Sequence, residues 1–277
     1  MSSDVRRRNN VQVSGSGQAM IFAHGFGCDQ NMWRFVAPAF ARRYQVVLFD
    51  YVGSGKSDLS AYDPRRYASL DGYAQDVLEI CDALDLRDAI FVGHSVSSVI
   101  GTLAANRAPE RFERLLFVGP SASYINDPPY IGGFERADIE GLLEMMDKNY
   151  LGWASFLAPA VMKNPEQPSL TTELEQSFCS TDPKIARRFA QLTFLSDNRA
   201  DFAKLKVPSL IMQCSDDAIA PLSAGEFLAR EIPSNTFRLL EATGHCPHMS
   251  APAETIDVIN SYLALPLAAR RMNRSVA

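Results

Sequence analysis

The residue whose surroundings most favour chemistry is Ser95. It lies in the run Gly93-His94-Ser95-Val96-Ser97, which follows a short apolar segment and precedes a helix-compatible one. This run nearly matches G-x-S-x-G, the pattern of a strained strand-to-helix turn that exposes a serine hydroxyl between small neighbours. Ser97 stands where the second glycine would be, and an ordinary loop with a polar helix cap would also match five residues. The motif alone leaves both interpretations open.

The partners that a nucleophilic serine needs occur further along the chain. A serine hydroxyl reacts readily only when a base accepts its proton and a carboxylate orients that base. Asp216 and Asp217 directly follow one apolar run, and His245 lies just after another. The order serine, aspartate, histidine is one of those found in hydrolytic triads. The spacing therefore predicts a triad of Ser95, one aspartate and His245.

Residues close to the predicted triad leave other assignments of its members open. Adjacent residues of an extended segment point to opposite sides, so only one of Asp216 and Asp217 can face the histidine, and this alternation does not choose between them. His248 is placed to cap the final helix. A metal site of His245, Cys246 and His248 is the other possible chemistry, but no further ligand cluster accompanies it. We expect neither a metal nor another cofactor.

Seven short apolar runs bounded by turn residues predict strands. They cover residues 11–13, 19–23, 45–49, 89–92, 115–118, 210–213 and 236–239. The turn Ser14-Gly15-Ser16-Gly17 predicts a hairpin between the first two. Helices are expected over residues 31–40, 70–84 and 96–106, with Ser69 capping the second. This alternation predicts an α/β fold with a mostly parallel central sheet flanked by helices, whose ligands bind beyond the carboxyl ends of the strands.

The alternation stops in the middle of the chain, where the pattern is helical. Four helices are predicted, over residues 135–148, 150–161, 171–180 and 183–194. We expect them to form a four-helix cap inserted after the sixth strand. The predicted division is a hydrolase core of residues 1–121 and 201–277 and a cap of residues 122–200.

The cap and its surroundings carry more large apolar side chains than four short helices would bury among themselves. Most of these side chains are needed for packing of cap against core, and a few are expected to form a pocket above Ser95. The predicted substrate-binding residues are Tyr124, Phe134, Leu142, Trp153, Phe156, Phe194 and Ile219.

Composition narrows the function classes. The chain has 277 residues, of which 47% are hydrophobic and 21% charged, with a net charge of -5, which favours a globular protein and argues against a nucleic-acid partner. The basic clusters at residues 6–8 and 270–274 are expected to be solvated tails. No run approaches the ~18 apolar residues of a membrane span, and no signal peptide is recognised. Five scattered cysteines fit reduced thiols in the cytoplasm.

Several motifs resemble those of the RsbQ-like α/β-hydrolases, a group that includes a bacterial stress-response regulator and the plant karrikin and strigolactone receptors. The matching motifs cover nearly the whole chain, cap included. They are His24-Gly25-Phe26-Gly27-Cys28-Asp29-Gln30, Asp50-Tyr51-Val52-Gly53-Ser54-Gly55, Gly93-His94-Ser95-Val96, Asn126-Asp127-Pro128-Pro129, Phe178-Cys179-Ser180-Thr181-Asp182-Pro183 and Gly244-His245-Cys246-Pro247-His248-Met249-Ser250. The form Gly93-His94-Ser95-Val96-Ser97 resembles that of the plant receptors more than that of the bacterial regulator, which has glycine in place of Ser97.

The resemblance implies an α/β-hydrolase fold and a role for each site residue. Ser95 would be the nucleophile, His245 the base and Asp217 the acid that orients it, because the family's acid precedes a pattern that residues 218–221 approximately match. The backbone N–H groups of Phe26 and Val96 would form the oxyanion hole.

Two functions follow as hypotheses. One is a serine hydrolase that cleaves an ester or lactone of a small hydrophobic molecule. The other is a ligand-responsive signalling protein with slow hydrolysis, for which the resemblance implies a PAS-domain phosphatase as partner. Both use the same catalytic residues, so the sequence does not separate them.

Overall fold

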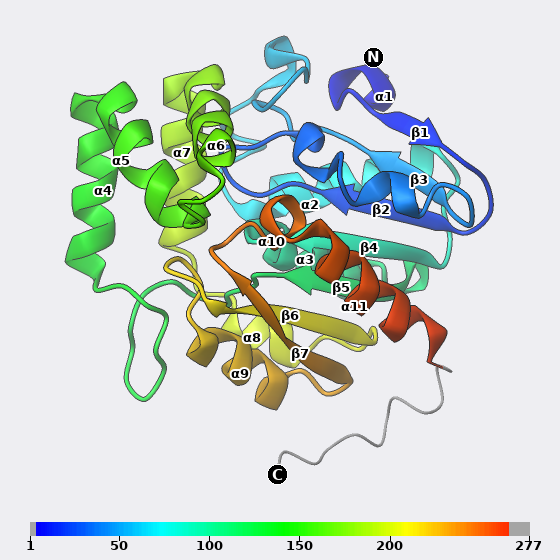
Figure 1. The fold of residues 1–277 in the computed structure, drawn as a ribbon. Helices are drawn as coiled ribbons and strands as arrows, with labels where there is room; N and C mark the ends of the chain where they lie inside the picture. The colour runs from blue at the N-terminus through cyan, green and yellow to red at the C-terminus, as the bar shows by residue number, and fades with distance from the viewer. Residues whose placement is uncertain (1–3, 266–277) are drawn as a thin grey trace.

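A seven-stranded sheet forms the centre of the structure, a computed structural model that describes residues 4–265 (Figure 1). The strand order is β1-β3-β2-β4-β5-β6-β7, and only the pairing of β1 with β3 is antiparallel. The strands are β1 (Gln12–Ser14), β2 (Ala19–Ala23), β3 (Gln45–Leu48), β4 (Ala89–His94), β5 (Phe112–Val118), β6 (Ser209–Asp216) and β7 (Asn235–Thr243). All residues of β2 and β4 are buried, as parallel strands covered on both faces require. The predicted α/β architecture is confirmed.

Helices cover both faces of this sheet. In Figure 1, α11 crosses in front of the sheet, whereas α2 and α3 lie behind it. The helices around the sheet are α1 (Val5–Arg8), α2 (Leu70–Ala83), α3 (Val96–Arg107), α8 (Arg199–Ala203), α9 (Leu222–Glu231), α10 (Pro247–Ser250) and α11 (Pro252–Ala264). The Ser69 hydroxyl caps α2 as predicted, accepting the Asp71 N–H at 3.3 Å. Within residues 4–265, no helix is long and apolar enough to cross a membrane.

A four-helix cap lies between β5 and β6 in the chain. It consists of α4 (Arg136–Lys148), α5 (Tyr150–Met162), α6 (Pro168–Ser180) and α7 (Pro183–Phe194). Figure 1 shows these helices together at the left, beyond the carboxyl ends of the parallel strands. The cap follows the fifth strand and not the sixth as predicted, because only β1 to β5 precede α4 in the described chain. The domain boundaries stay a prediction.

Two local predictions are wrong. β1 pairs with β3 and not with β2, so the chain does not begin with a hairpin. The connecting turn packs closely on the chain before β3, where a Cβ at Gly15 would lie 2.3 Å from the Ala41 carbonyl oxygen. The predicted helix at residues 31–40 is instead two 3-10 turns, η1 (Gln30–Trp33) and η2 (Ala37–Ala39). Pro38 lacks the N–H that a continuous helix would need there. Two further 3-10 turns are η3 (Leu59–Ala61) and η4 (Pro109–Arg111).

The first basic cluster is not a solvated tail throughout. Arg8 is 7% exposed, and its Nη2 donates to the Asp76 carboxylate at 3.0 Å. Asp76 is fully buried and also pairs with Arg66. Because a buried carboxylate needs charged or hydrogen-bonding partners, this contact fixes α1 onto α2. The second cluster, residues 270–274, lies outside the described residues.

Candidate active site

Ser95 occupies the sharp turn between β4 and α3. Its φ of 55° and ψ of -122° are costly for a non-glycine residue. The turn is held by the Ser95 N–H, which donates to the Val118 carbonyl on β5 at 2.8 Å. Gly93 leaves no room for a side chain, since a Cβ there would lie 2.8 Å from the Ser97 carbonyl oxygen. The predicted strand-to-helix turn is therefore present at Ser95.

Ser97 shows how the departure from glycine is accommodated. Its side chain is buried, and its hydroxyl donates to the His24 carbonyl oxygen at 2.5 Å. The Tyr51 hydroxyl lies 2.8 Å from the same Ser97 oxygen. These hydrogen bonds compensate for the loss of water around the buried Ser97 hydroxyl. They also link α3 to the end of β2.

The structure brings together the three residues of the predicted triad. His245 Nε2 lies 2.8 Å from Ser95 Oγ, and His245 Nδ1 lies 2.7 Å from Asp217 Oδ2. All three side chains are buried. The other carboxylate oxygen of Asp217 accepts the N–H groups of Ile219 and Ala220 at 2.8 and 3.0 Å, which fixes the orientation of the carboxylate. A serine, a base and an orienting acid are thus aligned in one chain of contacts.

The alternative aspartate faces elsewhere. Asp216 is exposed, and its carboxylate pairs with Lys163 at the end of α5. The two carboxylates point in different directions because they are neighbours in an extended segment.

Tyr124 makes a contact with Ser95 that the sequence does not reveal. Its hydroxyl lies 3.2 Å from Ser95 Oγ, and its side chain is 2% exposed. Burial raises the pKa of the Tyr124 phenol, so it stays protonated at neutral pH. A protonated phenol can donate a hydrogen bond to the nucleophilic oxygen.

The loop that carries Phe26 is rigidly held beside Ser95. His24 Nδ1 donates to the Gly25 carbonyl at 2.8 Å, and His24 Nε2 accepts the Tyr51 N–H at 3.1 Å. Burial lowers the pKa of His24, which keeps it in this neutral form. Within residues 4–265, the N–H groups of Phe26 and Val96 have no protein acceptor. Their role in an oxyanion hole stays a prediction.

A small, mostly apolar cavity lies above Ser95 and His245. Its volume is about 30 Å³, which is room for roughly one water molecule. Its lining residues are Phe26, Cys28, His94, Ser95, Leu157, Val161, Leu174, Phe178, Phe194, Ile219, His245 and Cys246. The Phe26 ring contacts Trp153, Phe178, Phe189 and Phe194, with centroids 5.7 to 6.2 Å apart. Aromatic side chains of the cap therefore nearly fill the site.

The predicted pocket residues divide into three groups. Phe194 and Ile219 line the cavity. Tyr124 contacts Ser95, and Trp153 packs behind Phe26 at 6.0 Å. The remaining three do not line the cavity; they are Phe134, Leu142 and Phe156.

Phe156 is the clearest error among them, because its side chain is 60% exposed. The inner face of α5 carries Trp153, Leu157 and Val161, which recur every four residues and are all buried. Phe156 lies one position off this stripe. The same helical spacing could have identified Leu157 and Val161, which were missed.

A second histidine cluster lies directly behind the triad. His94 Nε2 donates to the His245 carbonyl at 2.8 Å, and the His248 ring packs between Trp33 and His94. His248 does not cap α11; within residues 4–265 its ring nitrogens have no partner. Burial, with the neighbouring imidazoles, lowers the pKa of His248 to about 3 and that of His94 well below its usual value. Both rings are therefore neutral.

The candidate ligand atoms of His94, Cys246 and His248 lie within 4.8 Å of one another. His245, which the alternative metal site would have used, is not part of this group. Both of its ring nitrogens contact the triad partners instead.

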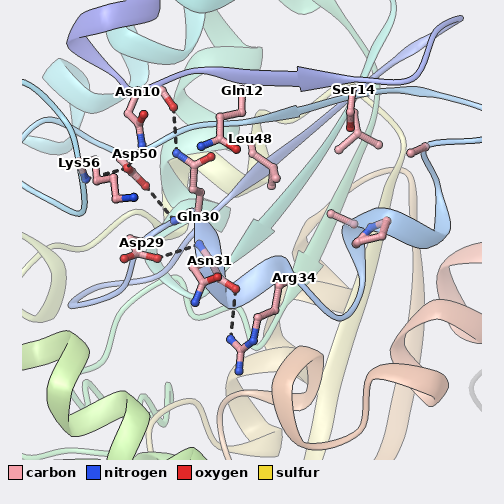
Figure 2. Close-up of a pocket in the computed structure, with 14 residues that line it drawn as sticks. Asn10, Gln12, Ser14, Asp29, Gln30, Asn31, Arg34, Leu48, Asp50 and Lys56 are labelled. Atoms are coloured by element: carbon pink, nitrogen blue, oxygen red, sulfur yellow. Dashed lines mark hydrogen bonds between the residues drawn. The ribbon is translucent and has the colours of Figure 1, made fainter.

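A larger cleft lies away from this site. It measures about 630 Å³ and shares no lining residue with the cavity above Ser95 (Figure 2). Asp50, 1% exposed, accepts hydrogen bonds there from the backbone N–H groups of Gln30 and Lys56 and from the Asn10 side chain. The cleft thus has a structural carboxylate at its edge, and no serine–histidine pair. Chemistry and not size distinguishes the candidate active site.

Comparison with known proteins assigns the family. The sequence model of the alpha/beta hydrolase family matches residues 20–258, so the chain belongs to this family and is a hydrolase. It is 36% identical to the strigolactone esterase D14 of Arabidopsis thaliana over 247 residues, 88% of this chain and 92% of that protein. It is 35% identical to the karrikin insensitive 2 receptor CA of Petunia hybrida over 257 residues, 92% of this chain and 95% of that one. The structure of olei00960, a hydrolase from Oleispira antarctica, matches with a TM-score of 0.93 and 44% identity, covering 95% of this chain and 97% of that chain.

Proposed function

We propose that this hydrolase cleaves an ester or lactone of a small hydrophobic molecule, with Ser95 as nucleophile, His245 as base and Asp217 as orienting acid. The observation that carries the proposal is the contact chain from Ser95 Oγ through both nitrogens of His245 to Asp217, at 2.8 and 2.7 Å. Its position under an apolar cavity favours a substrate with an apolar acyl or leaving group.

The reaction proceeds through an acyl-enzyme. Ser95 Oγ attacks the carbonyl carbon while His245 Nε2 takes the hydroxyl proton. The N–H groups of Phe26 and Val96 donate hydrogen bonds to the developing oxyanion. His245 then gives its proton to the leaving alcohol, and a water molecule activated by the same base releases the acid. The sequence of steps needs no cofactor.

The small volume of the cavity constrains the rate of hydrolysis. A space of about 30 Å³ does not hold an ester, so cap side chains must move before a substrate binds. Turnover is therefore expected to be slow for bulky substrates.

A second candidate function is an RsbQ-like signalling role in the cytoplasm, in which occupancy of the cavity or slow hydrolysis changes affinity for a PAS-domain phosphatase. The similarity to a karrikin receptor and the small volume of the cavity support this signalling role. Both functions use the same triad.

The test is hydrolysis of p-nitrophenyl acetate by the wild-type protein and by Ser95→Ala, followed beyond one product per enzyme. Ser98→Ala is the matched control, because it removes another buried serine hydroxyl three residues further along, on α3. Multiple turnover abolished only by Ser95→Ala supports the esterase, and a single burst supports the signalling role. Equal rates for wild type and Ser95→Ala would rule out Ser95 as nucleophile.

A further inference from the structure

The C-terminal end of the cap helix α5 is hydrogen-bonded directly to the base loop, residues 243–245, which carries the proposed base. The Val161 carbonyl accepts the His245 N–H at 2.8 Å. The last carbonyls of a helix have no partner inside the helix, and here the base loop supplies one. The main chain of His245 is therefore attached to the cap as well as to the sheet.

Asn164 makes a second connection between the same two segments. Its Nδ2 donates to the Met162 carbonyl at 2.7 Å and to the Thr243 carbonyl at 3.0 Å. One side-chain amide thus joins the end of α5 to the start of the base loop.

The backbone at this junction is strained and closely packed. Lys163 and Asn164 have φ values of 49° and 51°, a region that is costly for lysine and better tolerated by asparagine. Gly244 has a φ of 82°, and a Cβ there would lie 2.2 Å from the Met162 carbonyl oxygen. Such strain persists only where the surrounding contacts fix it.

The helix that holds the base loop also contacts any ligand. Leu157 and Val161 of α5 line the cavity above Ser95. Because the cavity is about 30 Å³, a ligand larger than water must displace cap side chains such as these. A displacement of α5 reaches His245 directly through the hydrogen bond that its N–H donates to the Val161 carbonyl.

We propose that Asn164 is a positioning residue for His245, and that the end of α5 couples occupancy of the cavity to alignment of the base. This inference rests on the proposed function. Proton transfer is sensitive to misplacement, since an error of about 1 Å in a reacting group costs roughly 100-fold in rate. Substrate that moves only side chains and leaves the backbone of α5 in place is processed by an aligned base, and a ligand that displaces the helix itself slows the reaction.

The test compares Asn164→Gly with Asn10→Gly. Both replace an asparagine at positive φ, with φ values of 51° and 46°, by the residue that adopts this region freely. Asn10 donates its amide to Asp50 at 2.7 Å at the edge of the large cleft, so the control loses a comparable hydrogen bond away from the triad. We expect kcat for p-nitrophenyl acetate to fall about tenfold in Asn164→Gly with KM nearly unchanged, and to stay within about twofold in Asn10→Gly.

Hydrogen exchange gives a readout that does not depend on activity. The amides of residues 243–245 should exchange faster in Asn164→Gly than in wild type, and at the wild-type rate in Asn10→Gly. Should Asn164→Gly be too unstable to purify, Asn164→Asp keeps the side-chain shape but loses both donated bonds, and the same losses are expected. Equal effects of the two glycine variants, or unchanged kcat and exchange in the Asn164 variants, would overturn the proposal. Failure of the proposed function has a different signature: activity that survives in Ser95→Ala.

Discussion

At the scale of single residues, the four histidines of the chain share burial and differ in what their ring nitrogens contact. His245 joins an acid to a hydroxyl, whereas His24 and His94 bond to backbone groups. His248 lies between two rings, and neither of its ring nitrogens has a partner within residues 4–265. The chemistry available to each imidazole follows from these partners, because a nitrogen already donating to a carbonyl cannot accept a proton.

Tyr124→Phe is expected to lower kcat for p-nitrophenyl acetate about tenfold, because the Ser95 hydroxyl loses the phenol that helps to fix it at 3.2 Å. Steady-state kinetics measure the effect. Tyr130→Phe is the control, since its hydroxyl donates to the Ser123 carbonyl at 2.6 Å and does not touch Ser95. An unchanged or faster reaction in Tyr124→Phe would show that the phenol does not position the nucleophile.

At the scale of elements, periodic patterns were predictable and contacts between elements were not. The bounds of α7 follow from a proline after Asp182 and a clear amphipathic pattern, and they match the prediction. The partner of β1 depends on how a glycine turn packs against the chain before β3. A local sequence pattern does not contain this long-range contact. The site divides in the same way. Ser95 and His245 lie in loops with recognisable sequences. The prediction for Phe156 is wrong because neighbouring residues of a helix point in different directions, so Leu157 faces inward and Phe156 faces solvent.

Phe178→Ala in α6 is expected to open the cavity, because the ring lines it and packs against Phe26 and Trp153 at 6.2 and 5.2 Å. KM for p-nitrophenyl hexanoate should fall about tenfold relative to the acetate, at some loss of stability. Leu170→Ala removes another buried side chain of α6 that does not line the cavity. If both variants change the ratio of the two KM values equally, Phe178 does not limit the size of the acyl group.

At the scale of the whole molecule, folding holds imidazoles in their neutral form. Burial lowers the pKa of His24 and His94, and that of His248 to about 3, from an ordinary value of 6.5. In the unfolded chain these rings take up protons once the pH falls below about 6.5. The unfolded state then binds more protons than the folded state, so the free energy of unfolding decreases with decreasing pH.

We therefore expect the free energy of unfolding, measured by urea titration, to be greatest near pH 7 and to decrease from about pH 6.5 downward. His248→Phe should reduce the proton uptake on unfolding at pH 5.5 by about one proton, because that ring no longer titrates. The nitrogens of His248 have no partner within residues 4–265, so phenylalanine should fit between Trp33 and His94 without losing a hydrogen bond. The same pH dependence in both proteins would contradict this account.

The small size of the cavity above Ser95 has a consequence for timing. Under the proposed function, a ligand larger than this space enters and leaves only when cap side chains move, so their motion would limit how long it stays bound. Under the proposed signalling role, a ligand that leaves slowly would keep the protein in its occupied state after the free ligand has gone.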